Sequence, residues 1–171
     1  MPPALVVGDI LAALFSRGRT DDDDEQFHWT ICLPTNTTTA KKLHAKSVTA
    51  SDFMFENPPV DIRLPFSQTA TAGLRIVLTA PTGTLKNEHD LNAIITLLGK
   101  IPMVTPPEEA GIPFNCLVWF RQAVRCLHDS GYLNCPDVYA LEAECRKYGE
   151  ANDASYESWQ GYMYFIAESS K

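Results

Sequence analysis

One cysteine and two histidines are the residues of this sequence whose types and positions best suit covalent chemistry. Asn115 is a good helix N-cap, so Cys116 is expected in the first turn of an apolar helix. At that position the helix dipole and the backbone N–H groups favour an anion, which eases loss of the thiol proton and yields a nucleophilic thiolate. The same N–H groups can receive the oxyanion of a tetrahedral intermediate. The alternative is a buried cysteine that only packs, as free cysteines commonly do.

The histidines lie on two segments that are expected to form a hairpin. Residues 27–33 alternate large apolar with polar or small side chains, which is the period of a half-buried strand. If the following turn is centred on Asn36, His44 on the returning strand lies directly opposite His28 and on the same face. A slip of one residue would put the two rings on opposite faces, so this expectation depends on the register. Together with Cys116 they would supply a base, an orienting group and a nucleophile.

These motifs resemble those of the circularly permuted papain-like cysteine enzymes. The resemblance rests on Phe27-His28-Trp29-Thr30-Ile31, on Leu43-His44, and on Asn115-Cys116 followed by Trp119-Phe120. The group includes the lecithin:retinol acyltransferases, the phospholipase A/acyltransferases and permuted relatives of NlpC-type cell-wall peptidases. Desumoylating isopeptidases have a similar order of motifs, and the pattern is also similar to that of small fungal proteins. The resemblance implies a permuted papain-like architecture with His28 as general base, His44 as orienting residue and Cys116 as nucleophile.

The chain departs from the acyltransferases at several positions. The expected turn after residue 33 lacks their glycine, Leu117 replaces the glutamate that follows their cysteine, and the last residues are too polar and too few to form their membrane-spanning segment. The predicted function is therefore a thiol hydrolase or acyltransferase acting through an acyl-enzyme thioester on an amide, ester or peptide bond. The substrate would be a small molecule or a peptide. The alternative is a binding or regulatory module that keeps the fold without turnover.

No cofactor and no metal are expected. A zinc site made of Cys32, His28 and His44 is conceivable, because all three share one strand face, but no closely spaced ligand pair marks it. The five cysteines contain no Cys-x-x-Cys pair, which favours reduced thiols and a cytoplasmic location over a disulfide framework. The net charge is −7, and the run at 21–25 supplies five of the negative charges. No stripe of basic residues indicates binding to nucleic acid. The apolar stretch at 4–15 is too short to span a membrane.

Length and composition predict a single domain, and the order of its expected elements, strands first and helices after, predicts an α+β fold in which an antiparallel sheet packs with helices. The chain has 171 residues, of which 45% are hydrophobic and 20% are charged. An N-terminal extension over residues 1–25, with a short helix at 6–15, would precede the domain at 26–171. Strands are expected at 27–33, 41–48, 52–56, 60–64 and 74–79. Helices are expected at 88–98, at 116–128, at 137–148 with Gly149 as C-terminal cap, and at 155–166.

Overall fold

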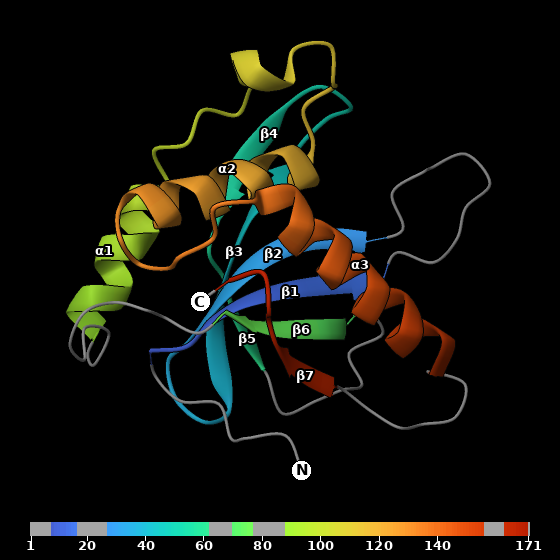
Figure 1. Cartoon of the computed structure of the whole chain (residues 1–171). Coiled ribbons are helices and arrows are strands. Elements are labelled where there is room, and N and C mark those ends of the chain that lie inside the picture. Colours follow the sequence, from blue (N-terminus) through green and yellow to red (C-terminus); the bar gives the residue numbers. More distant parts are fainter. Residues whose placement is uncertain (1–7, 17–26, 62–69, 77–87, 156–162, 171) are drawn as a thin grey trace.

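The computed structural model describes residues 8–16, 27–61, 70–76, 88–155 and 163–170. These residues form a seven-stranded sheet, and three α-helices lie on one of its faces (Figure 1). The strands are β1 (Ile10–Ser16), β2 (Phe27–Pro34), β3 (Thr39–Ser47), β4 (Phe53–Glu56), β5 (Pro59–Asp61), β6 (Ala70–Ile76) and β7 (Met163–Ile166). The helices are α1 (Glu88–Leu98), a short 3₁₀ helix η1 (Pro107–Glu109), α2 (Cys116–Asp129) and α3 (Val138–Ser155). The expected α+β class is confirmed.

The sheet has the strand order β4-β3-β2-β1-β6-β7, and β5 also pairs with β3. All pairs are antiparallel except β6 with β7, which are parallel. Because β1 lies between β2 and β6, residues 10–16 belong to the same sheet as the strands that follow residue 26. The boundary expected after residue 25 therefore does not separate β1 from the sheet, and the acidic run itself lies outside the described residues.

The helix expected at 6–15 is wrong, because the described part of this stretch forms β1. Ile10, Ala12 and Leu14 pack in the large core beneath the helices, whereas Leu11 and Ala13 pack in a smaller cluster on the other face. A strand buried on both faces reads as a continuous apolar run. Such a run does not reveal its period of two, and it cannot be told from a buried helix by pattern alone.

The C-terminal part also differs from expectation. Helix α3 does not end at Gly149 but continues to Ser155. The glycine is instead a close-packing position, because a Cβ added there would lie 3.0 Å from the ring of Phe27 and 3.3 Å from Leu14. The helix expected at 155–166 is also wrong, since Met163–Ile166 forms β7 beside β6. The strand propensity of its aromatic and β-branched residues agrees with this pairing, but the partner strand is distant in sequence and no local pattern indicates it.

The large core lies between the sheet and the helices. Alternate residues of β2 face it, and all four are fully buried: Phe27, Trp29, Ile31 and Leu33. They meet the apolar face of α2, where the expected helical spacing of Leu117, Phe120, Val124 and Leu127 is confirmed by their burial. Each such side chain contributes roughly 1.5–3 kcal/mol when it leaves water. This packing fixes α2 against β2.

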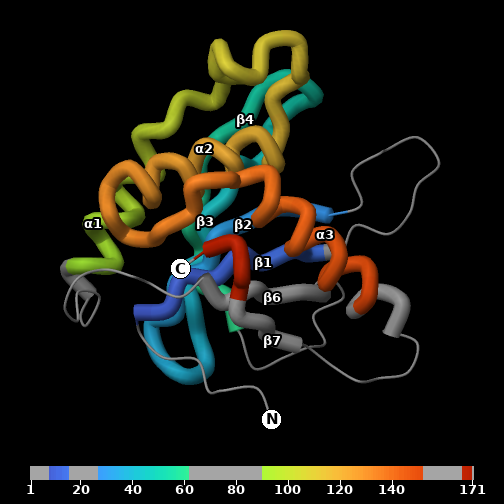
Figure 2. Tube along the Cα trace, viewed as in Figure 1, coloured from blue at the N-terminus to red at the C-terminus, as the bar shows by residue number. Residues whose placement is uncertain are grey.

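The sheet divides at the middle of β3. The ladder between β2 and β3 runs only from Pro34–Ala40 to Ile31–Leu43. Beyond that point β2 continues along β1, whereas β3 continues along β4 through His44–Ser47. Figure 2 shows the β3–β4 hairpin running away from the β1–β2 pair. Among the described residues, the two strand pairs are therefore separated by a gap in the ladder, which we name the β2–β3 opening.

Candidate active site

Cys116 begins α2, as the sequence predicts. Asn115 has an extended backbone, and its side-chain oxygen accepts hydrogen bonds from the N–H groups of Leu117 and Val118, both at 3.0 Å. This is the N-cap geometry, which satisfies two of the backbone donors that a helix start leaves unpaired. Cys116 itself is 2% exposed. The cap therefore fixes the thiol at the positive end of the helix dipole but within a closely packed region.

The first turns of α2 cover the β2–β3 opening. Trp119 contacts Phe55 of β4 with ring centroids 6.0 Å apart, and its neighbour Phe120 contacts Trp29 of β2 at 5.1 Å. The helix thus packs on both sides of the opening. Cys116 lies three and four residues before these aromatic residues, so it lies on the same helix face. The helix therefore presents Cys116 on the side that faces the opening.

His28 and His44 meet beside the same opening. The Nε2 atom of His28 lies 2.8 Å from Nδ1 of His44, and the two rings are edge-on with centroids 4.8 Å apart. The expected contact between these rings is confirmed, but the expected register is wrong. The turn is centred one residue later than Asn36, so β3 is shifted by two residues and the histidines meet diagonally. A shift of two residues keeps each side chain on its face, which explains why the contact survives.

The sequence analysis missed Glu56, the third member of this polar group. Glu56 lies opposite His44 in the β3–β4 ladder, so the two side chains share a face. Its Oε2 atom is 3.7 Å from Nε2 of His44, and its Oε1 atom accepts a hydrogen bond of 2.9 Å from Lys46. No motif marks this glutamate, and only the pairing of residues 53–56 with β3 could have indicated it.

The environment of His44 keeps its ring neutral. Burial, with a smaller contribution from the positive charge of Lys42, lowers the pKa of His44 from 6.5 to about 4. Glu56 acts in the opposite direction, and its own pKa is lowered mainly by the hydrogen bond from Lys46. At neutral pH the interaction between His28 and His44 is therefore a hydrogen bond in which the His44 ring is uncharged.

The position of Cys116 relative to the histidines follows from strand alternation. Along β2, Trp29 points toward α2 and belongs to the large core with Cys116, whereas His28 points to the other face with Thr30. Cys116 and His28 therefore start from opposite faces of β2. The structure thus brings the two histidines together on one face of β2, whereas Cys116 lies in the large core on the other face.

Cys32, Cys135 and Cys145 have the properties of structural cysteines. Cys32 shares the face of His28, but burial raises its pKa to about 11, and its sulfur lies 3.7 Å from the hydroxyl of Thr30. Burial also raises the pKa of Cys135 to about 11 and that of Cys145. A thiol with a raised pKa is rarely a thiolate and is a poor nucleophile at neutral pH.

No metal centre is found in the described part of the chain, where no three His, Cys, Asp or Glu side chains are grouped so that they could hold an ion. The zinc site considered for Cys32, His28 and His44 is therefore not formed. His128 has a structural contact, because its Nδ1 atom accepts the backbone N–H of Cys135 at 3.2 Å. The side chain of His89 lies outside the described residues.

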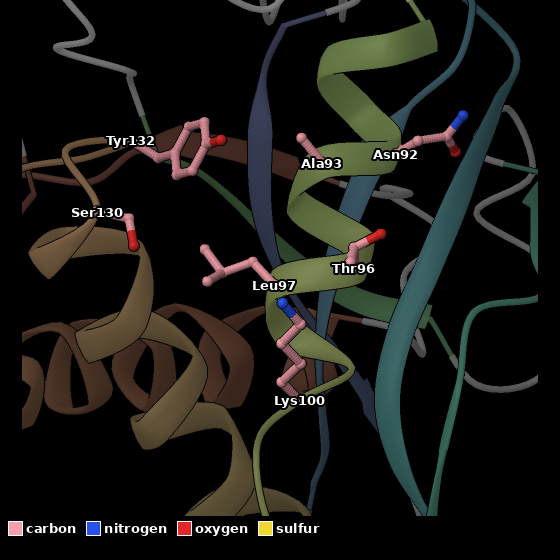
Figure 3. A pocket seen from close by; sticks show the side chains of 7 residues that line it. All are labelled: Asn92, Ala93, Thr96, Leu97, Lys100, Ser130 and Tyr132. Carbon is pink, nitrogen blue, oxygen red and sulfur yellow. The ribbon is translucent and has the colours of Figure 1, made fainter.

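A cavity of about 510 Å³ lies between α1 and the residues that follow α2. Figure 3 shows Ala93 and Leu97 of α1 facing Ser130 and Tyr132 across it. The 14 residues of α2 separate this cavity from Cys116 by about 20 Å at 1.5 Å per residue. The cavity therefore does not adjoin the histidine pair, and it contains none of the candidate catalytic residues.

The function of this chain is inferred from the geometry of the site alone. No family model, curated protein or solved structure matches this chain. No helix within the described ranges is both long and apolar enough to cross a membrane.

Proposed function

We propose that this chain is a cysteine-dependent hydrolase or acyltransferase with a permuted papain-like arrangement of its catalytic residues. The observation that carries the proposal is the hydrogen bond between His28 and His44 beside the opening that the first turn of α2 covers. A hydrogen-bonded histidine pair supplies the base and the orienting group, and a thiol at a helix N-terminus supplies the nucleophile, that such catalysis requires.

The reaction begins with proton transfer from the thiol of Cys116 to His28, which leaves the electron pair on sulfur. The thiolate attacks the carbonyl carbon of an amide, ester or peptide bond and forms a tetrahedral oxyanion. The backbone N–H of Cys116, at the start of α2, would receive this oxyanion. The protonated His28 then gives its proton to the leaving amine or alcohol, and an acyl-enzyme thioester remains.

The second half-reaction removes the acyl group from sulfur. Attack by water releases the acid and makes the protein a hydrolase, whereas attack by an amine or alcohol makes it an acyltransferase. In both cases His28 takes the proton of the attacking group, and the electron pair of the broken C–S bond returns to Cys116. All five cysteines are free, so we place this chemistry in the reducing cytoplasm with a small-molecule or peptide substrate.

One observation favours a second function. Cys116 is 2% exposed and belongs to the large apolar core, which is the setting of a packing cysteine rather than of a nucleophile. In this alternative the chain is a binding or regulatory module that keeps the histidine pair without turnover. The two functions differ in the reactivity of one thiol.

Site-resolved alkylation tests the choice. The protein is treated near pH 6 with limiting iodoacetamide, and the modified cysteines are identified by mass spectrometry in the wild type and in His28→Ala. At this pH an ordinary thiol is almost wholly protonated, so preferential labelling of Cys116 reports a lowered pKa. We expect selective modification of Cys116 in the wild type and its loss in His28→Ala.

Two controls make the alkylation result specific. Cys32 and Cys145, with raised pKa values, are internal controls that stay unlabelled. His128→Ala removes a histidine from the other end of α2 and should leave Cys116 labelling intact. Equal and slow labelling of all five cysteines in the folded wild type would overturn the enzyme proposal and leave the binding module.

A further inference from the structure

The buried ring nitrogen of His44 that faces away from His28 has an unusual setting. Its Nε2 atom is buried and has no hydrogen-bond partner among the described residues. The nearest charge of opposite sign to a protonated ring is the Oε2 atom of Glu56 at 3.7 Å. A buried polar atom normally has a hydrogen-bond partner. The carboxylate of Glu56 therefore lies close to Nε2 of His44 without a hydrogen bond between the two groups.

The carboxylate of Glu56 is held in this position from its other side. Lys46 donates a hydrogen bond of 2.9 Å to Oε1, which leaves Oε2 directed at His44. Both residues lie on the face of the β3–β4 hairpin that carries His44, because Glu56 is the ladder partner of His44 and Lys46 is two residues further along β3. The charged groups that act on His44 are Lys42, Lys46 and Glu56, and His28 is its hydrogen-bonded neighbour.

These contacts line up three side chains, those of His28, His44 and Glu56. One of the two possible arrangements of their ring protons is favourable. A proton on Nε2 of His44 points at the carboxylate, and Nδ1 then accepts the Nε2–H of His28. The remaining nitrogen of His28, Nδ1, is left with its lone pair and can act as a base. The opposite arrangement would direct the lone pair of His44 at a carboxylate and place a proton on Nδ1 of His28, where a base is needed.

We propose that Glu56 is a positioning residue that stabilises the protonated form of the His28–His44 pair, and that Lys46 moderates this effect. When His28 accepts a proton on Nδ1, the positive charge is shared along the hydrogen bond toward His44 and the carboxylate. Opposite charges within a few ångströms favour the charged form of a base, and a competing lysine weakens that attraction. The role of this chain in activating Cys116 rests on the proposed function, whereas its effect on the histidines does not.

The test is a titration of His28 followed by NMR of its ring nitrogens in the full-length chain carrying Cys116→Ala. Glu56→Gln removes the charge but keeps the shape, and Lys46→Gln is the matched control at the other end of the same ion pair. We expect Glu56→Gln to lower the pKa of His28 by about 0.3–1 unit and Lys46→Gln to raise it by a smaller amount. A merely structural role for Glu56 would not move the two variants in opposite directions.

The outcomes separate this inference from the proposed function. An unchanged pKa of His28 in folded Glu56→Gln, or a shift of the same sign in both variants, overturns the inference. If the titrations shift as expected, the pH profile of Cys116 alkylation is then measured with the cysteine restored. A profile that moves with the titration in each variant supports both proposals. A pH profile of Cys116 alkylation that does not move with the titration of His28 leaves the positioning role intact and overturns the thiol chemistry.

Discussion

Two polar clusters lie on opposite sides of the large core, one on the outer side of α2 and one on the sheet face that points away from α2, and their hydrogen bonding differs. The arginine cluster joins η1, α2 and α3 through five side chains: Glu109, Arg121, Arg125, Tyr139 and Glu142. On the sheet, the histidine cluster consists of His28, His44 and Glu56. In the arginine cluster one guanidinium meets two carboxylates, since Arg121 contacts Glu142 at 2.6 Å and Glu109 at 3.5 Å. In the histidine cluster one hydrogen bond joins two rings.

This difference indicates which cluster builds the structure and which can carry chemistry. Arginine keeps its charge at every accessible pH, so the two guanidinium groups of the arginine cluster always donate to their partners and hold the elements in a fixed geometry. The histidine cluster can place its shared proton on either ring, because each imidazole nitrogen can donate or accept a hydrogen bond. A site that must accept and return a proton needs the second arrangement, and a joint between helices needs the first.

The largest expected effect tests the arginine cluster. Glu109→Ala leaves Arg121 and Arg125 without a carboxylate that is itself 3% exposed. Loss of one partner from a buried ion pair should lower the free energy of unfolding by about 3 kcal/mol or more. Urea unfolding measures this, with the exposed neighbour Glu108→Ala as control, which should change stability by less than about 0.5 kcal/mol. A similar effect of both variants would mean that the cluster is not structural.

The next effect is a pH dependence that arises from His44. Its pKa is about 4 in the folded chain, below the ordinary 6.5, so between these values the unfolded chain binds a proton that the folded chain does not. Stability is therefore complete above pH 6.5 and is lost as the pH falls toward 4. We expect about 1–2 kcal/mol from this residue after allowance for solvent screening. His44→Asn should flatten the wild-type curve in urea unfolding between pH 7 and 4.5, and an unchanged slope would contradict this account.

The cap that positions Cys116 gives a smaller effect. Asn115→Ala removes the acceptor for two backbone N–H groups and should lower the free energy of unfolding by about 1 kcal/mol. Asn115→Ser retains a capping side chain and should recover most of this loss. If Cys116 is the nucleophile, its alkylation near pH 6 should also slow in Asn115→Ala. Equal stability of the alanine and wild-type chains would show that the cap does not hold the helix start.

The smallest effect concerns the ion pair at the solvent side of the histidine cluster. Lys46 is 52% exposed, and its pair with Glu56 should contribute less than about 1 kcal/mol to stability. Lys46→Met is therefore expected to unfold at nearly the wild-type urea concentration. The result would separate the two clusters, because an ion pair between a carboxylate and a basic side chain is expected to stabilise the arginine cluster strongly and the histidine cluster only weakly. A loss comparable to that of Glu109→Ala would remove the distinction between the clusters.

Local patterns predicted the elements around the site well. The alternation in residues 27–33 identified β2, and Asn115 before an apolar helical face identified the start of α2 at Cys116. The contact between His28 and His44 was also predicted, although through a register that is wrong by two residues. The predicted contact is nevertheless present, because the sheet face on which a side chain lies depends only on whether its position is odd or even. The register depends instead on where the turn is centred, and a shift of two residues does not change the face.

Non-local features were beyond the sequence. Burial on both faces hides the period of the central strand β1, so its sequence pattern predicts a helix. No local pattern indicates β7, because its partner β6 lies about 90 residues earlier. Glu56 joined the site only through the pairing of β4 with β3. The arginine cluster also escaped prediction, since η1, α2 and α3 each contribute charges that look like ordinary solvent-exposed residues.

The sequence by itself determined the candidate chemistry: a cysteine at a capped helix start and two histidines on neighbouring strands with the same parity. These follow from rules that act within a few residues, namely helix capping and the period of two. Only the tertiary structure decided that β2 and β3 separate beside the histidines and that α2 covers the opening. It also decided that Glu56 lies opposite His44 in the β3–β4 ladder. Those features arise where segments distant in the chain share one packed space, and no short stretch of sequence contains that information.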